Sequence, residues 1–261
     1  MITAASNSRI KRLVQLNQKS KLRRTEDVFL AEGVKMFLEA PREQLQEVYV
    51  SESFLEKCSC REHLEEVGYE VVSDSVFSKI SDTCTPQGVL CVLKQFHYNI
   101  EEMLRDKAPL FLLLENIQDP GNLGTMLRTG EGAGVSGIIM SRDTVDLYNP
   151  KVIRSTMGSI YRVPFYYAED FAAAVHQVQQ AGVSVYAAHL RGKNSYACQD
   201  YTKGTAFLIG NEGNGLREET AELADCYIRI PMEGKVESLN AAVASSILMY
   251  EAHRQRATLE K

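Results

Sequence analysis

One stretch of the sequence decides the fold, residues 110–140, which reads LFLLLENIQDPGNLGTMLRTGEGAGVSGIIM. Five apolar residues, Leu110 to Leu114, are typical of a strand buried on both faces. Asp119 followed by Pro120 predicts a helix start, because aspartate caps free backbone amides and proline suits the first helical position. A second apolar run, Gly137 to Met140, predicts another strand. The order strand, helix, strand is typical of a parallel sheet.

The same alternation continues to the C-terminus. Strands are predicted at 163–166, 183–188, 206–209 and 227–230, and helices at 171–180 and 238–254, with shorter turns after Pro150 and near Leu216. Continuous apolar strands that alternate with helices are covered on both faces. We therefore predict an α/β fold with a parallel sheet in this part of the chain.

A smaller α/β unit is expected in front of this domain. Its strands are predicted at 28–31, 47–50, 70–72 and 88–93, and its helices after a cap at Ser6 or Asn7, after Gly33, and at 53–67. Residues 95–108 are mostly polar and lead into Pro109, which indicates a linker. The predicted division is therefore 1–94, 95–108 and 109–261.

Composition places the chain among ordinary globular proteins. It has 261 residues, of which 44% are hydrophobic and 24% charged, and 29 basic and 34 acidic residues give a net charge of −5. Its apolar runs are far shorter than the roughly 20 residues that cross a bilayer, and its polar, basic N-terminus does not resemble a secretory signal. We therefore expect a cytoplasmic protein that does not associate with membranes.

The six cysteines show no CxxC spacing. Cys58, Cys60 and His63 could supply part of a metal site, but structural zinc needs four ligands and no second pair follows. Reduced thiols and no bound metal are the expectation.

A glycine pattern at the end of the first predicted helix of this domain imitates a nucleotide-binding motif. Gly132, Gly134 and Gly137 spell GxGxxG. In a dinucleotide site that motif follows a strand and opens a helix. Here it ends a helix and leads into a strand, so we predict a helix stop and disfavour a nicotinamide-dependent dehydrogenase.

The helix that starts at Asp119 carries a bare face. Four residues lie on one side of it at helical spacing: Gly121, Gly124, Arg128 and Gly132. Each glycine costs a helix about 1 kcal/mol relative to alanine, so three on one face indicate the close approach of another backbone or a ligand. Spacing alone leaves two roles open for Arg128, a surface salt bridge or a functional group.

Two later segments also combine loops with reactive or polar residues. Residues 208–216 end a buried strand in a loop of glycine and asparagine around one carboxylate, Glu212. Open α/β sheets bind ligands at such strand ends, but simple turns would explain the loop equally well. Residues 230–244 lead into the last helix, which Ser238 can cap. Taken alone, this segment predicts only a packed C-terminal helix.

Together and in this order, the segments 116–128, 209–216 and 230–244 resemble the signature motifs of the SpoU/TrmH family of RNA ribose 2′-O-methyltransferases. The resemblance extends from Leu110 to the C-terminus and includes the stretch from Asn149 to Gly158. The N-terminal part is similar to the family's small RNA-binding substrate domain. That similarity is carried by Phe29, Glu32, Gly33 and the strand Gln87-Gly88-Val89.

The resemblance implies a fold and a chemistry that periodicity cannot show. The sheet would carry a deep trefoil knot at its C-terminal end, the methyl donor would be S-adenosylmethionine, and the protein would be a homodimer through the catalytic domain. The implied catalytic residues are Asn122, Arg128, Glu212, Ser238 and Asn240. The implied cofactor contacts are Gly210, Ile230 and Leu239, with Leu190 at the end of another strand.

Methyl transfer to a ribose hydroxyl needs alignment of the reacting atoms and removal of a proton. Arginine is a poor base because its pKa lies above ~12, so Arg128 is expected to hold a phosphate of the target nucleotide and to stabilise the developing alkoxide. Asn122 and Asn240 are expected to hydrogen-bond the ribose or to tune the donor's site. Ser238 would orient its loop, and Glu212 would brace the loop or Arg128.

Charge is unevenly distributed along the chain. Residues 1–25 contain seven basic residues and no acidic ones, so the rest of the chain carries a net charge of −12. An ordinary solvated helix face would explain this, but localised phosphate contact fits it better. The candidate RNA contacts are Arg9, Lys11, Arg12, Arg23 and Arg24.

Two classes of function remain open. The first is methyl transfer to a structured RNA, with ribosomal RNA favoured over tRNA because a separate N-terminal domain suits a site on a large RNA. The second is a non-catalytic RNA-binding or ribosome-assembly factor, which would have lost Asn122, Arg128, Glu212 or Asn240. All four are present. No histidine lies in the motifs, so His189 and the other four histidines are expected to be structural or surface residues.

Overall fold

The computed structural model describes residues 1–258. Its contacts divide the chain into two compact units. The first holds Met1–Phe96 and Asp146–Tyr161, and the second holds His97–Val145 and the described residues from Arg162 onward. Within residues 1–258, no helix combines the length and the apolar character that a membrane crossing requires.

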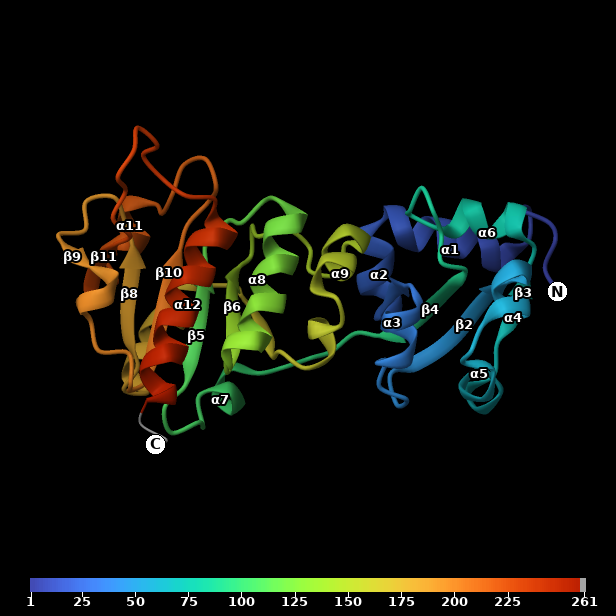
Figure 1. Ribbon diagram of the computed structural model, residues 1–261, viewed down its shortest axis with the longest axis horizontal. Coiled ribbons are helices and arrows are strands. Elements are labelled where there is room, and N and C mark those ends of the chain that lie inside the picture. Colours follow the sequence, from blue (N-terminus) through green and yellow to red (C-terminus); the bar gives the residue numbers. More distant parts are fainter. Residues whose placement is uncertain (259–261) are drawn as a thin grey trace. The chain divides into compact units, whose positions relative to one another are not determined.

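The second unit is built on a parallel sheet, which has seven strands among the described residues (Figure 1). In spatial order they are β7 (Phe165–Ala168), β6 (Gly137–Ser141), β5 (Leu110–Leu114), β10 (Thr205–Ile209), β8 (Ser184–Ala188), β11 (Cys226–Arg229) and β9 (Asn194–Ser195). Every adjacent pair is parallel. The predicted α/β fold with a parallel sheet is confirmed. All residues of the central strands β5 and β10 are buried, as a sheet covered on both faces requires.

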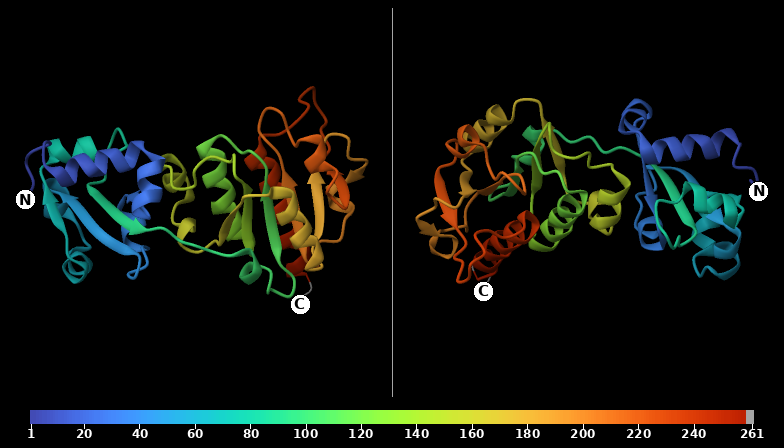
Figure 2. Two further views of the ribbon diagram at one scale, coloured as in Figure 1. Left: turned by 180° about the vertical axis from the view of Figure 1, so that it is seen from behind. Right: turned by 90° about the horizontal axis from the view of Figure 1, so that it is seen from above.

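Helices cover both faces of this sheet. α8 (Pro120–Ala133) and α12 (Ala241–Ala257) pack side by side, and α12 also contacts β5 and β10 (Figures 1 and 2). On the other face lie α10 (Phe171–Gln180), α7 (Ile100–Met103) and α11 (Glu218–Ala221). Phe111 and Leu113 of β5 face this second layer, because alternate residues of a strand point to opposite faces.

α8 begins and ends where the sequence predicts. The side chain of Asp119 caps it by accepting from the backbone N–H of Asn122 over 2.8 Å, and Pro120 is its first residue. It ends at Gly134, whose φ of 76° is left-handed, so the GxGxxG pattern is a helix stop. A Cβ on Gly132 would lie 3.0 Å from the hydroxyl of Tyr250 in α12. The bare end of α8 therefore accommodates the neighbouring helix.

α12 begins after a cap two residues later than the one predicted at Ser238. Its N-cap is Asn240, whose Oδ1 accepts from the backbone N–H groups of Ala242 and Val243 at 2.9 and 3.2 Å. The prediction that Ser238 caps this helix is wrong. Asparagine caps as well as serine does, and at position 240 it places its amide within reach of α8, as described below.

The first unit contains a four-stranded mixed sheet in the order β1 (Val28–Glu32), β4 (Val89–Lys94), β2 (Leu45–Ser51) and β3 (Glu70–Val72). Its helices are α1 (Ser8–Gln18), α2 (Ser20–Glu26), α3 (Val34–Leu38), α4 (Glu52–Lys57), α5 (Arg61–Val67), α6 (Asp74–Ile80) and α9 (Pro150–Thr156). Asn7 caps α1, as predicted. The single helix predicted at 53–67 is two helices, and α2 and α6 were not predicted.

Residues 146–161, which the sequence places in the second part of the chain, pack within the first unit. The guanidinium of Arg23 donates to Asp146 over 2.5 Å, and the hydroxyl of Tyr161 donates to the carbonyl of Met36 over 3.0 Å. The ring of Tyr148 lies against that of Phe29, with centroids 4.8 Å apart. This segment is therefore part of the core that the first 96 residues form.

Candidate active site

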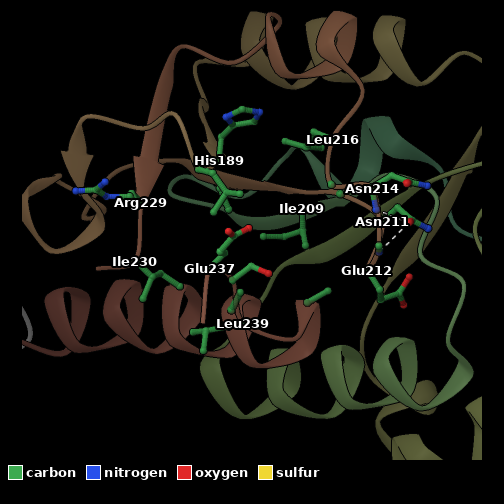
Figure 3. A pocket seen from close by; sticks show the side chains of 18 of the residues that line it. His189, Ile209, Asn211, Glu212, Asn214, Leu216, Arg229, Ile230, Glu237 and Leu239 are labelled. Atoms are coloured by element: carbon green, nitrogen blue, oxygen red, sulfur yellow. Dashed lines mark hydrogen bonds between the residues drawn. The ribbon is translucent and has the colours of Figure 1, made fainter. Parts of the chain in front are cut away.

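The candidate active site is a cavity at the carboxyl edge of the parallel sheet. It has a volume of about 270 Å³ and is lined by the loops after β8, β10 and β11 and by the start of α12 (Figure 3). Parallel sheets bind ligands at this edge because the loops that follow the strands converge there. All four residues expected to contact a cofactor line the cavity: Leu190, Gly210, Ile230 and Leu239.

The loop after β10 is folded tightly against itself. Asn211 and Gly215 exchange backbone hydrogen bonds of 3.1 and 2.9 Å, and Gly215 has a left-handed φ of 70°. The side-chain oxygen of Asn211 accepts from the backbone N–H groups of Gly213 and Asn214, at 3.0 Å each. A Cβ on Gly210 would lie 2.2 Å from the carbonyl carbon of Gly215. Only glycine fits at this position, and the folded loop itself forms one wall of the cavity.

Three of the predicted catalytic residues are joined by hydrogen bonds beside this loop. Nδ2 of Asn240 donates to Oδ1 of Asn122 over 2.9 Å, and Nδ2 of Asn122 donates to Oε1 of Glu212 over 3.0 Å. Glu212 also accepts from the backbone N–H groups of Gln118 and Asp119, at 3.1 and 3.0 Å. We call this set the Asn240–Asn122–Glu212 chain. It brings together residues from all three sequence motifs.

The Asn240–Asn122–Glu212 chain affects the pKa of Glu212 and the orientation of the Asn122 amide. Burial disfavours the charged form of Glu212, but the hydrogen bonds from Asn122 and from the amides of Gln118 and Asp119 outweigh it, so the pKa of Glu212 is lowered. An ionised Glu212 accepts only, which fixes the orientation of the Asn122 amide. Each of the two asparagine Nδ2 groups keeps a second N–H that this chain does not use. The chain therefore presents donors, not a base.

Arg128 and Ser238 lie outside this chain. Arg128 is exposed on α8 and makes no hydrogen bond or ion pair with another described residue. Its guanidinium is thus available to a ligand, and the alternative of a surface salt bridge finds no partner in residues 1–258. Ser238 is exposed and lines the cavity just before α12. Glu212 braces the loops and does not contact Arg128.

Two further residues lie at this edge of the sheet: His189, which the sequence analysis assigned no part in the site, and Glu115, which it did not single out. His189 lines the cavity, with its ring 5.1 Å from that of Tyr227, and its Nδ1 accepts from the backbone N–H of Arg191. Burial, and next the charge of Arg191, lower the pKa of His189. Glu115, directly after β5, is buried and has charged and polar partners. A carboxylate that ends an unbroken apolar strand was the sequence signal that could have identified it.

The basic residues near the N-terminus differ in their exposure and in whether they form ion pairs. Arg9 pairs with Glu70 at 2.6 Å, and Arg12 pairs with Glu26 and Glu47 at 2.7 Å each. Arg23 is only 2% exposed, so it cannot reach a phosphate, and its expected role in RNA contact is withdrawn. Instead its guanidinium donates to the carbonyl of Leu16 and to Asp146. Lys11 and Arg24 are exposed and have no ion pair among residues 1–258.

The lining of the cavity fits S-adenosylmethionine, which combines an adenosine, whose base has apolar faces and polar edges, with a positively charged methionine part. Leu190, Ile230 and Leu239 supply apolar walls, and the backbone of the tight loop after β10 supplies hydrogen-bonding groups. Glu237 supplies a carboxylate, and Figure 3 shows it between His189 and Leu239. The donor and acceptor set therefore suits a cationic nucleoside.

Two family-level matches cover the chain. Residues 109–250 match the SpoU rRNA Methylase family. Residues 7–91 match the MRM3-like substrate binding domain. Together the matches span both halves of the sequence.

Individual relatives match over nearly the whole length. The chain is 32% identical over 252 residues to 23S rRNA (guanosine(2553)-2′-O)-methyltransferase RlmP of Bacillus subtilis, covering 95% of this chain and 97% of that protein. The crystal structure of an AdoMet-bound rRNA methyltransferase from Sinorhizobium meliloti has a TM-score of 0.83 at 31% identity and covers 97% of both chains. A crystal structure of an RNA 2′-O ribose methyltransferase has a TM-score of 0.83 at 29% identity, covering 98% of this chain and 99% of that one. On the sequence motifs, the fold and these matches, the chain belongs to the SpoU rRNA methylase family.

Proposed function

We propose that this protein transfers a methyl group from S-adenosylmethionine to a ribose 2′-hydroxyl of ribosomal RNA, and that it does so in the cytoplasm. Family membership makes it an S-adenosylmethionine-dependent RNA 2′-O-ribose methyltransferase. One observation carries the proposal: the Asn240–Asn122–Glu212 chain lies beside a cavity that suits the cofactor. Ribosomal RNA is proposed because two relatives that match nearly the whole chain, RlmP and the Sinorhizobium meliloti methyltransferase, are named for it.

The residues proposed to hold S-adenosylmethionine are those of the cavity wall. Leu190, Ile230 and Leu239 would enclose its apolar parts, and the backbone at Gly210 would hydrogen-bond its polar edges. When bound, the cofactor supplies an electrophilic methyl group on a sulfonium. The protein then has to align the hydroxyl and stabilise the charge that develops on its oxygen.

The polar groups near the cavity divide this work. Arg128 would bind the phosphate of the target nucleotide and stabilise the developing alkoxide, because a guanidinium donates hydrogen bonds and keeps its charge. The remaining N–H groups of Asn122 and Asn240 would hydrogen-bond the ribose, with Glu212 holding Asn122, which in turn accepts from Asn240. Ser238, exposed at the rim, would orient the segment before α12.

The first unit is proposed to bind RNA. We assign residues 1–94 to RNA binding and 109–261 to methyl transfer, except that residues 146–161 pack within the first unit; residues 95–108 connect the two and include α7 of the second unit. The match of residues 7–91 to a substrate binding domain supports this division. Lys11 and Arg24 are the proposed phosphate contacts, because both are exposed and carry no ion pair within residues 1–258. Arg9 and Arg12 would contribute less, since each already faces a carboxylate.

We propose two further features of the methyltransferase domain, a trefoil knot and a homodimer. The knot is supported by strand order: β10 lies between β5 and β8, β11 lies outside β8, and the chain then returns to place α12 against β5 and β10. Dimerisation through α12 is supported by Val243 and Tyr250, which are 48% and 49% exposed. Light scattering of the purified protein tests the dimer, and a crystal structure traced from 188 to 241 tests the knot.

The rival function is a non-catalytic RNA-binding or assembly factor on the same fold. Retention of the whole Asn240–Asn122–Glu212 chain together with an available Arg128 favours the enzyme. The decisive experiment supplies ribosomal RNA and isotope-labelled S-adenosylmethionine, then maps 2′-O-methyl positions by mass spectrometry in RNA from wild-type and deletion strains. Calorimetry with S-adenosylmethionine and with NAD shows which of the two cofactors the protein binds. RNA binding without transfer, or NAD binding alone, would refute the proposal.

A further inference from the structure

Arg217 joins three loops at the carboxyl edge of the parallel sheet. It directly follows the loop 210–216 that lines the cavity. Its guanidinium pairs with Asp143, in the loop after β6, and lies 3.5 Å from Oε1 of Glu115, at the end of β5. Its backbone N–H also donates to Oε2 of Glu115 over 2.8 Å. None of these three residues belongs to the motifs identified in the sequence.

The buried end of this arrangement is Glu115. Its side chain is only 2% exposed, so its charge has to be compensated inside the protein. Arg217 supplies a backbone N–H and a guanidinium, and the hydroxyl of Thr220 donates as well. Removing a partner from a buried charge is costly, so Glu115 strongly favours one position of Arg217.

The exposed end of the arrangement is Asp143. Its carboxylate accepts from Oγ of Ser141 over 2.5 Å, and that oxygen accepts in turn from the backbone N–H of Asn116 over 2.8 Å. Its carbonyl oxygen accepts from Nε2 of Gln118 over 2.6 Å. Asn116 and Gln118 lie in the loop whose backbone amides bind Glu212. Both loops that meet at Glu212 are thus anchored to one guanidinium.

We propose that Arg217 is a positioning residue for methyl transfer, which holds Asn122 in place through Glu212 and does not touch the RNA. The inference rests on the proposed function of the site. Arg217 is half exposed, 51% of its side chain, so direct contact with an RNA phosphate is the opposing explanation. The two explanations differ in one respect: a residue that acts through Glu212 loses its effect once Glu212 has been changed.

The test is a double-mutant cycle on the full chain, with S-adenosylmethionine and ribosomal RNA. Single-turnover transfer rates are measured for wild type, Arg217→Ala, Glu212→Gln and the double variant. We expect Arg217→Ala to lower the rate about tenfold in the wild-type background and less than about twofold further in the Glu212→Gln background. The affinity for RNA and its salt dependence should stay unchanged. Additive losses, or a weaker RNA affinity with a shallower salt slope, would overturn the proposal.

Two further variants keep the test independent of misfolding. Asp143→Ala frees the exposed end and leaves Glu115 paired, so it should lower the rate in the same direction but less; no loss in this variant counts against the proposal. Arg142→Ala is the matched control, because Arg142 lies in the same loop and pairs only with Glu169 among the described residues. It should transfer methyl groups at the wild-type rate, and an equal loss in Arg142→Ala and Arg217→Ala would overturn the assignment.

A readout without RNA separates this inference from the proposed function. Amide hydrogen exchange of residues 210–216 should be faster in Arg217→Ala than in wild type and unchanged in Arg142→Ala, since Arg217 directly follows that loop and ties it to Glu115 and Asp143, whereas Arg142 pairs with Glu169. Unchanged exchange in Arg217→Ala would refute the inference. A wild-type protein that fails to methylate RNA would refute the proposed function, whatever the exchange rates show.

Discussion

Glu212→Gln is the substitution that tests the Asn240–Asn122–Glu212 chain most directly, because it keeps the shape of the side chain. Glu212 accepts three hydrogen bonds, from Asn122 and from the backbone N–H groups of Gln118 and Asp119. A glutamine replaces one oxygen with an NH2 group, which then faces a donor. At least one of the three bonds is lost, and two donors are brought together.

The size of the effect follows from the environment of the carboxylate. A hydrogen bond to a charged group contributes about 1.5–3 kcal/mol, and the exposure of Glu212 places it at the lower end, about 1.5 kcal/mol. If that energy holds Asn122 in its reactive position, its loss lowers the transfer rate about tenfold. Single-turnover transfer at saturating S-adenosylmethionine and RNA measures this loss without interference from product release.

Glu218→Gln is the matched control. Glu218 belongs to the segment after the same loop, and its carboxylate pairs with Arg191 at the surface. It should transfer at the wild-type rate, while Glu212→Gln should keep its thermal midpoint within a few degrees and lose rate. Transfer by Glu212→Gln within twofold of wild type would refute the role of the chain, and so would an equal loss in both variants.

Arg128→Ala should lower methyl transfer at least 100-fold with the fold and S-adenosylmethionine affinity retained, since a donor to a developing oxyanion contributes about 3 kcal/mol; calorimetry and transfer rates check this, and a loss within a few fold would sink the assignment. Gly210→Ala should lower the free energy of unfolding by about 3 kcal/mol and abolish cofactor binding, because its Cβ would lie 2.2 Å from a backbone carbon. Calorimetry that finds wild-type cofactor affinity in this variant would contradict the tight packing of the loop. Because the pKa of Glu212 is lowered in the folded protein, the stability that it contributes is complete above the ordinary glutamate pKa of about 4.3 and is lost as the pH falls through the lower folded value. The free energies of unfolding of wild type and Glu212→Gln, measured in urea, should therefore approach each other only below about pH 4.3. A difference that stays constant with pH would disprove the lowered pKa of Glu212. Neutralising Lys11 and Arg24 together should weaken RNA binding and reduce its log–log salt slope by about 2 without changing cofactor affinity, and an unchanged slope would exclude both contacts.

The sequence predicted the elements in which local signals agree. β5 is an unbroken apolar run, and α8 has a capping aspartate, an N-terminal proline and a glycine stop, so its start at Pro120 was predictable. The single helix predicted at 53–67 is wrong because the break at 58–60, Cys-Ser-Cys, has no glycine or proline to mark it. The inclusion of residues 146–161 in the first unit rests on contacts such as Arg23 with Asp146, which are 123 residues apart. No local pattern carries such a pairing.

The sequence motifs named residues that lie together at the candidate site, but they did not predict the hydrogen bonds between them. The motif resemblance named Asn122, Glu212 and Asn240. Only the structure shows that Glu212 accepts hydrogen bonds from backbone amides and makes no contact with Arg128. The basic N-terminal residues show the opposite limit. Charge counting treats Arg23 and Arg24 alike, yet one is buried and bonded and the other is exposed. Exposure depends on which face of a helix meets the core, and adjacent residues lie 100° apart.

The position of the cap of α12 connects folding with chemistry. A cap at Ser238 would have started the helix two residues earlier and turned Asn240 into an ordinary helical side chain. With Asn240 as the cap, its Oδ1 is used by the helix amides and only its Nδ2 remains to meet Asn122. The same hydrogen bonds that stabilise the start of α12 therefore orient the amide that faces α8, and Ser238 is left free at the cavity rim. A misplaced cap would weaken the helix and disorder the site together, which explains why the sequence places an asparagine there rather than relying on the nearby serine.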